Sequence, residues 1–210
     1  MTAPDSPTPV TPAYATLLDL ARSRRSAYAY SDAPVTDDAL AKILEVARHA
    51  PSSYNEQPWR VVVARRGEAG YDGLHAALQG RNPDWAGTAP ALGLTLASPT
   101  FSQTGAHNRH AWHDVGAFVV LLSLAADALG LSLHQMAGID GAAAADALGV
   151  PDRFDVVTAF ALGYPAETRG AGLPDELAAR DRTDKPRRPI EETASGPTWN
   201  APLGLAPPGL

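Results

Sequence analysis

The spacing of apolar side chains predicts helices and strands in alternation along most of the chain. Helical spacing of Leu40, Ile43 and Leu44 follows Thr36, whose hydroxyl suits an N-cap. The β-branched run 61–63 predicts a strand instead. We expect helices over residues 13–24, 36–49, 68–78, 110–129, 140–148 and 174–180, and strands over 59–64, 90–97, 131–136 and 156–162. From this order and one uninterrupted core, the pattern alone predicts a single domain of the α/β type.

The most apolar stretch of the chain covers residues 115–133. Its length is near that of a membrane span, but Asp127 and Gly130 interrupt it, and its flanks are rich in His and Gly. These features favour a buried helix followed by a strand, with no membrane partner. The helix is apolar nearly all round between Phe118 and Leu124. A domain of this size cannot surround such a helix, so we expect a homodimer that buries it against a second copy.

The two ends differ in composition from the middle. Residues 1–12 contain four prolines and are expected to form a disordered tail; residues 13–192 are expected to form the domain, and residues 193–210 a Pro-rich C-terminal extension. The tail lacks the apolar segment of a signal peptide, so we expect a cytoplasmic protein.

Charge and cysteine content exclude several classes of function. The 210 residues include 17 Lys and Arg against 23 Asp and Glu, which argues against nucleic acid as a partner because phosphates require a basic face. The chain has no cysteine, so thiolate nucleophiles, disulfides and Cys-ligated metal or iron–sulfur sites are excluded.

Two polar segments carry the candidate chemistry. Residues 50–60 join a helix to a strand with small hydroxyls, two amides and two prolines, and with almost no charge. Such neutral donors and acceptors suit the edge of a flavin or a sugar better than a phosphate; an ordinary helix-to-strand loop is the alternative. The second segment, Arg22-Ser23-Arg24-Arg25-Ser26, is basic and bears hydroxyls in an otherwise acidic chain.

Together with Gln135-Met136-Ala137-Gly138 and Arg187-Arg188-Pro189, these segments resemble the FMN-dependent nitroreductase family in order and spacing, over about residues 14–192. The resemblance implies an α+β, three-layer fold with a central mixed sheet flanked by helices, in an intertwined homodimer with FMN at the subunit interface. It also implies a ping-pong reaction that passes hydride from NADH or NADPH, through flavin N5, to a nitroaromatic compound, a quinone or a similar small-molecule oxidant.

The resemblance assigns cofactor-binding roles by position. The residues expected to hold the phosphate and ribityl chain are Arg24, Arg25 and Ser26, with Lys185 and Arg187 closing on the same phosphate. A solvated surface charge is the alternative for each basic group. The residues expected to reach the flavin from the neighbouring subunit are Pro51, Ser52, Ser53 and Asn55.

Two further segments are expected near the flavin ring. Asn82 is placed by the resemblance near a carbonyl and the N3 edge, with a plain Asn-Pro turn as the alternative. The segment expected to turn backbone N–H groups toward N5 and O4 consists of Gln135, Met136, Ala137 and Gly138. No residue is assigned as a catalytic acid, base or nucleophile, because the flavin carries the chemistry.

Tyr28 departs from the family pattern. Most relatives place Arg or Lys two residues after the Ser, where a cation faces N1 and O2 of the flavin, whereas a phenol is neutral at pH 7. We interpret Tyr28 as a flavin-site residue that replaces a charged donor by a neutral one.

Two other functions compete with this interpretation. A metal site is suggested by three histidines that precede Asp114, namely His107, His110 and His113. On a helix, however, each step of three residues advances about 300° around the axis, which separates the third imidazole from the first two. We therefore expect no metal, and expect residues 108–113 to border the substrate opening. The other competing function is a protein that stores or sequesters flavin without turnover, under a lid formed by residues 98–109.

Overall fold

Four antiparallel strands form the central sheet of the molecule in the computed structural model, which describes residues 9–205. They are β1 (Trp59–Arg65), β2 (Ala91–Ala97), β3 (Ser132–Met136) and β4 (Asp155–Gly163), in the order β1-β2-β4-β3. The expectation of a mixed sheet is therefore wrong for the described strands. The helix between β3 and β4 has eight residues, about 12 Å. It is too short to return the chain along a strand of nine residues, about 30 Å, so the chain re-enters at the same end.

The helices agree closely with the expected ranges. They are α1 (Pro12–Ser23), α2 (Asp37–Ala47), α3 (Ala69–Ala76), α4 (Pro83–Ala86), α5 (Ala111–Ala128), α6 (Gly141–Leu148) and α7 (Asp175–Arg182), with the 3₁₀ turns η1 (Ser53–Asn55) and η2 (Ile190–Glu192). As expected, Thr36 caps α2: its hydroxyl accepts a hydrogen bond of 3.1 Å from the Ala39 N–H. The helix α4 lies outside the expected helix and strand ranges; Pro83 favours it because proline pre-sets the dihedral angle of the first helical turn.

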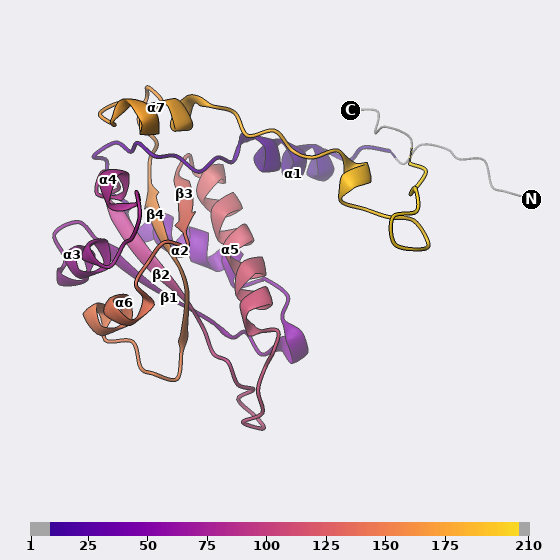
Figure 1. Cartoon of the computed structure of the whole chain (residues 1–210), viewed down its shortest axis with the longest axis horizontal. Helices are drawn as coiled ribbons and strands as arrows, with labels where there is room; N and C mark the ends of the chain where they lie inside the picture. Colours follow the sequence, from indigo (N-terminus) through magenta and orange to yellow (C-terminus); the bar gives the residue numbers. More distant parts are fainter. Residues whose placement is uncertain (1–8, 206–210) are drawn as a thin grey trace, which may run out of the picture.

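Helices cover both faces of the sheet, which gives three layers (Figure 1). On one face α2 and α5 pack against a core that contains Ile43 and Phe160; on the other, α3, α4 and α6 pack against a core that contains Leu74 and Trp85. Because β2 lies between two strands and under both helical layers, all seven of its residues are buried. These layers confirm the α+β class implied by the resemblance.

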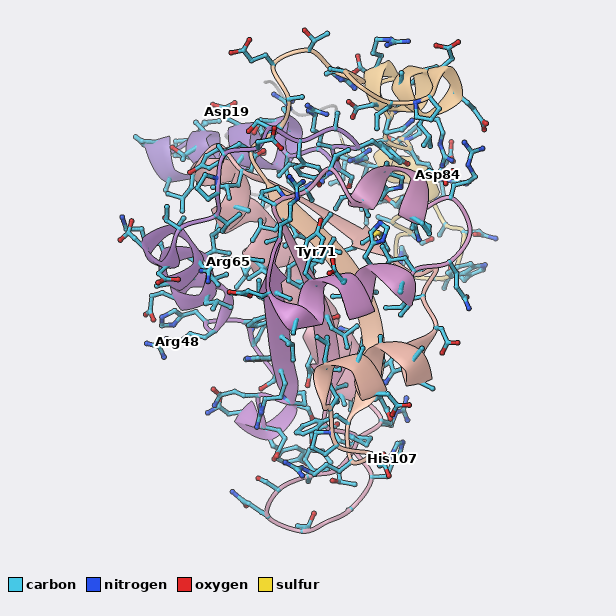
Figure 2. All side chains as sticks on the ribbon, turned by 90° about the vertical axis from the view of Figure 1, so that its left-hand side faces the viewer. Asp19, Arg48, Arg65, Tyr71, Asp84 and His107 are labelled. Carbon is cyan, nitrogen blue, oxygen red and sulfur yellow. The ribbon has the colours of Figure 1, made fainter. Side chains whose placement is uncertain are left out.

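Side chains divide between surface and interior as their chemistry requires. Figure 2 shows the charged side chains of Arg48, Arg65 and Asp84 at the surface, whereas the ring of Tyr71 lies inside. Tyr71 is 5% exposed, and its hydroxyl donates a hydrogen bond of 2.7 Å to the Ala89 carbonyl oxygen. The buried phenol is therefore satisfied and belongs to the core.

The apolar stretch forms α5 and then β3, as expected. By length and composition α5 could cross a membrane, yet half of it is buried inside the domain. Its remaining face is open and carries exposed apolar side chains beside His113: Val120 is 56% exposed and Trp112 is 52% exposed. A helix with this pattern is a core helix with one face left for another protein surface.

Both ends of the described chain project beyond the three layers (Figure 1). The helix α1 buries none of its residues, although Ser23 at its end donates a hydrogen bond of 2.5 Å to Asp127 of α5. Residues 1–8, most of the expected N-terminal tail, and residues 206–210 lie outside the described part, and α1 begins at Pro12. The expected boundaries of the tail and of the C-terminal extension stay predictions.

Candidate cofactor site

The segment between α1 and the sheet is held in place by two side chains of β3. Ser132 Oγ accepts a hydrogen bond of 3.1 Å from the Ala27 N–H and donates one of 2.8 Å to the Arg25 carbonyl oxygen. His134 Nδ1 lies 2.8 Å from the Ala27 carbonyl oxygen. Residues 25–28 are thus fixed against the sheet edge by side chains, which sets the directions of Arg24, Ser26 and Tyr28.

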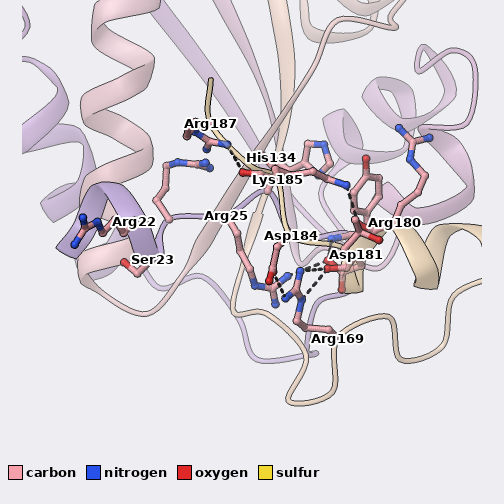
Figure 3. Close-up of a pocket in the computed structure, with 14 residues that line it drawn as sticks. Arg22, Ser23, Arg25, His134, Arg169, Arg180, Asp181, Asp184, Lys185 and Arg187 are labelled. Atoms are coloured by element: carbon pink, nitrogen blue, oxygen red, sulfur yellow. Dashed lines mark hydrogen bonds and ion pairs between the residues drawn. The ribbon is translucent and has the colours of Figure 1, made fainter. Parts of the chain in front are cut away.

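A basic cavity of about 580 Å³ opens between this segment and α7 (Figure 3). Seven cations line it: Arg22, Arg24, Arg25, Arg169, Arg180, Lys185 and Arg187. Two carboxylates, Asp181 and Asp184, line the same cavity. In a chain with a formal net charge of −6, such a local excess of positive charge is suited to a multiply charged anion.

Only two of the seven cations are neutralised by carboxylates within residues 9–205. Arg25 Nη1 lies 2.9 Å from Asp181 Oδ1, and Arg169 Nη1 lies 3.1 Å from Asp184 Oδ1. The cations left without a carboxylate partner in the described chain are Arg22, Arg24, Arg180, Lys185 and Arg187. Backbone contacts orient two of them: Lys185 Nζ donates to the Arg180 carbonyl oxygen at 3.3 Å, and Arg187 Nη1 to that of Lys185 at 2.7 Å.

A second, less charged cavity of about 280 Å³ continues from the first. The two cavities share Arg24 and Ser26. Apart from these two residues and Ala21 of α1, its lining comes from the outer face of α5 and from β3: Val120, Ser123, Leu124, Leu133 and Gln135. A basic chamber that adjoins an amphipathic one suits a ligand with a phosphate at one end and a flat, partly apolar group at the other.

Tyr28, Trp85 and His134 form an aromatic cluster at the basic cavity. The His134 ring stacks on Trp85 with a centroid separation of 4.3 Å, and Tyr28 meets the His134 ring edge-on at 4.6 Å. The Arg180 guanidinium lies 5.7 Å from the centroid of the Tyr28 ring, within the range of a cation–π contact. Tyr28 therefore lines the basic cavity, with its ring held by packing.

Burial lowers the pKa of His134, and the hydrogen bond to the Ala27 carbonyl only partly opposes this. Because a carbonyl oxygen can only accept, Nδ1 carries the proton of the neutral ring. Below about pH 6.5 the unfolded state binds more protons at this site than the folded state does. The contribution of neutral His134 to stability is therefore complete above that pH and is lost as the pH falls through it.

We expect the wild-type protein to lose more unfolding free energy than His134→Asn between about pH 7.5 and about pH 5.5, by at most about 1.4 kcal/mol per pH unit. Asn retains an N–H donor for the Ala27 carbonyl but cannot titrate. Urea denaturation at the two pH values measures the difference. Equal losses in the two proteins would show that His134 does not resist protonation.

The structure brings seven of the fifteen expected binding residues to the two cavities. Those at the basic cavity are Arg24, Arg25, Ser26, Tyr28, Lys185 and Arg187, and Gln135 lines the adjoining cavity. Met136 is buried in the core at 2% exposure and lines neither cavity, so its side chain is not available to a ligand. Direct binding by each of these residues stays a prediction.

Asn82 and Gly138 contact each other. Asn82 Nδ2 donates a hydrogen bond of 2.9 Å to the Gly138 carbonyl oxygen, and a Cβ on Gly138 would lie 2.8 Å from the same nitrogen. The close approach that requires glycine here is thus made by Asn82 and the nearby Gln79 backbone. Asn82 lines neither cavity, and its expected contact with a ring stays a prediction.

The expected neighbouring-subunit residues Pro51, Ser52, Ser53 and Asn55 line neither cavity of their own chain. The Ser53 N–H instead donates a hydrogen bond of 2.9 Å to Asp114, in the first turn of α5. The basic segment meets the other end of this helix, where Ser23 bonds to Asp127. Asp114 and Asp127 are thirteen positions apart along α5, which corresponds to about 20 Å. The loop is strained, with a φ of 54° at Tyr54 and 56° at Asn55.

The histidine cluster does not assemble. Within residues 9–205 no three His, Asp or Glu side chains are grouped so that they could hold a metal. His107 lies in the loop at the end of the molecule remote from α7 (Figure 2), whereas His113 Nδ1 lies 3.1 Å from Asp114 Oδ1. The metal interpretation therefore has no geometric support in the described chain.

Sequence reasoning missed six residues of the basic cavity: His134, Arg169, Arg180, Asp181, Thr183 and Asp184. Each is a single residue whose spacing carries no motif. Only His134 had an available signal. A half-buried strand alternates apolar and polar residues, but in β3 the polar His134 follows buried Leu133 and is itself followed by the polar Gln135, which breaks this alternation.

Known proteins resemble the chain in sequence and structure. A family model described as the nitroreductase family matches residues 21–86 and 77–164. A Thermus thermophilus protein named NADH dehydrogenase is 31% identical over 175 residues, covering 70% of this chain and 85% of that protein. An Archaeoglobus fulgidus protein named for NADH dehydrogenase and NAD(P)H nitroreductase is 29% identical, covering 79% and 94%. A crystal structure described as an oxidoreductase containing FMN has a TM-score of 0.81 and 28% identity, covering 96% of this chain and 100% of that one.

The side chains at the site fit FMN. Arg24, Lys185 and Arg187 carry positive charge that no carboxylate of residues 9–205 neutralises, which suits a dianionic phosphate, and Ser26 and Gln135 are neutral polar groups of the kind that suits a ribityl chain and a flavin ring. With the matches above, this donor set leads to one conclusion: the chain belongs to the nitroreductase family and is an NAD(P)H-dependent flavin oxidoreductase whose cofactor is FMN.

Proposed function

We propose that the protein oxidises NADH or NADPH and reduces a nitroaromatic compound, a quinone or a similar small-molecule oxidant in two successive half-reactions at one site. The observation that carries the proposal is the pair of adjoining cavities, one basic and one amphipathic, that share Arg24 and Ser26. FMN, when bound, would supply the hydride acceptor of the first half-reaction and the hydride donor of the second.

In this proposal the residues of the chain bind the cofactor and orient it. Arg24, Lys185 and Arg187 hold the phosphate, and Ser26 holds the ribityl chain. Gln135, with the backbone of residues 136–138, faces the ring, where fixed N–H donors stabilise charge that develops during hydride transfer. No protein acid or base is needed at the reacting atoms, which agrees with a cavity whose two carboxylates are both paired with arginines.

We propose further that two copies complete each site. Within one chain the basic segment and the loop 51–55 lie at opposite ends of α5 (Figure 1). A two-fold axis across the open face of α5 would run the two α5 helices antiparallel and bring the loop of each copy to the basic cavity of the other. The exposed Val120, which lines the amphipathic cavity, lies on this face.

The purified protein is expected to carry FMN and not FAD. The cations that have no carboxylate partner in the described chain line one cavity, which suits a single phosphate group, and no G-x-G-x-x-G sequence follows a strand, as a dinucleotide site would favour. Chromatography of the cofactor released by heat identifies it. Recovery of FAD, or failure of the apoprotein to take up FMN, would contradict the proposal. Steady NAD(P)H consumption with a nitroaromatic compound or quinone then separates an enzyme from a flavin-storing protein.

A further inference from the structure

Asp181 is the buried carboxylate of the basic cavity. Its side chain is 1% exposed, whereas that of Asp184, the other acid in the lining, is 95% exposed. Asp181 Oδ1 accepts hydrogen bonds from Arg25 Nη1 at 2.9 Å and from the Tyr28 N–H at 3.2 Å. Its Oδ2 accepts one of 2.7 Å from the Gly170 N–H. A buried charge with three donors is built into the fold and is not an incidental surface group.

These contacts join three segments that are far apart in the sequence (Figure 3). Asp181 itself lies on α7, its carboxylate holds residues 25–28, and its backbone carbonyl oxygen accepts hydrogen bonds from the Arg169 guanidinium, one of them 2.7 Å long. The cations of the cavity divide between the same segments. Arg22 and Arg24 precede the segment that Asp181 holds, whereas Lys185 and Arg187 follow the helix on which it lies.

The charge of Asp181 acts against anion binding. A carboxylate beside a site for a dianion repels it, and a buried ion pair such as Asp181–Arg25 gives little net stability when compared with apolar packing. Arg25, whose Nη1 is committed to Asp181, contributes correspondingly less charge to a ligand. Both observations are explained if Asp181 holds the segment that carries Arg22 and Arg24 in place against the segment that carries Lys185 and Arg187.

We propose that Asp181 is a positioning residue for the FMN phosphate, and that Arg25 serves as its partner and does not bind the phosphate directly. Asp181 fixes α7 and the cations that follow it against residues 24–28, so that Arg24, Lys185 and Arg187 face one phosphate. The proposal rests on the FMN site described above and assigns a role within it.

The direction in which one substitution changes the affinity for FMN distinguishes a positioning role from a purely electrostatic one. Asp181→Asn removes a negative charge, so Coulomb repulsion alone predicts tighter FMN binding. Loss of positioning predicts weaker binding instead, by about 5- to 150-fold, the usual range of coupling between sites. Asp184→Asn is the matched control: it removes an exposed carboxylate from the same cavity and is expected to bind FMN slightly more tightly. Quenching of flavin fluorescence, in titrations of the apoproteins, measures all three dissociation constants.

Arg25→Met tests the other half of the pair and covers the case in which Asp181→Asn does not fold. It leaves the Tyr28 and Gly170 N–H groups to satisfy Asp181. We expect weaker FMN binding in Arg25→Met and no further loss when Asp181→Asn is added. Wild-type or tighter binding by either single variant, or additive losses in the double variant, would overturn the proposal. Failure of the wild-type apoprotein to bind FMN would instead refute the flavin site itself.

Discussion

A Val120→Lys chain is expected to be a monomer that no longer retains FMN. Val120 is 56% exposed on the open face of α5 and lines the amphipathic cavity. An ammonium group buried there without a partner costs several kcal/mol, enough to prevent association of two copies. The loop 51–55 of the second copy is then lost from the site. The added positive charge would by itself favour an anionic ligand, so loss of FMN reports the missing subunit and not repulsion.

Light scattering coupled to size-exclusion chromatography, with absorbance of the flavin, measures mass and cofactor in the same peak. Ala143→Lys is the control, because Ala143 is exposed on α6, on the opposite face of the sheet from α5. That variant should remain a flavin-loaded dimer. A stable, flavin-loaded monomer at micromolar concentration, in either variant or in the wild type, would contradict the shared site.

Arg24→Ala is expected to weaken FMN binding about 10- to 150-fold, and Tyr28→Phe about fivefold. Arg24 has no carboxylate partner in the described chain and lies where the two cavities meet, so its loss removes a charge-assisted hydrogen bond worth about 1.5–3 kcal/mol. Tyr28→Phe keeps the ring that packs on Trp85 and His134 and removes the hydroxyl that we expect to donate one neutral hydrogen bond, worth about 1 kcal/mol, to the flavin.

Titration of the two apoproteins with FMN gives the order directly. Arg48→Ala provides the control for loss of an arginine, because Arg48 pairs with Glu45 on the surface of α2 and lines neither cavity. Equal losses in Arg24→Ala and Tyr28→Phe would mean that Arg24 does not contact the phosphate.

The helices and strands could be predicted because their signals are local. Thr36 marks the start of α2, and the β-branched run of residues 61–63 lies inside β1. The direction of the strands could not be predicted, because it depends on whether a connecting helix spans the sheet, and α6 is too short to do so. The helix α4 was missed because four residues beginning at Pro83 give no periodicity.

The site was only partly predictable for the same physical reason. Arg24 and Ser26 lie in a recognisable basic segment, but Lys185 and Arg187 were connected to it only through the family resemblance. Asp181 carries no local signal: its importance arises from burial and from donors more than 150 residues distant, such as Arg25. Contacts of this kind depend on tertiary packing, which spacing in the sequence does not encode.

Mixing two defective chains tests the central claim, a flavin site made from two copies, most directly. Arg24→Ala damages the basic cavity, and Ser53→Glu places a carboxylate in the loop that is proposed to cross to the other copy. Each homodimer should bind FMN poorly. In the heterodimer both defects fall in one site and the other site is intact, so the isolated heterodimer should bind one FMN per dimer with wild-type affinity. A heterodimer that binds FMN no better than its parent homodimers would show that each site is built from a single chain.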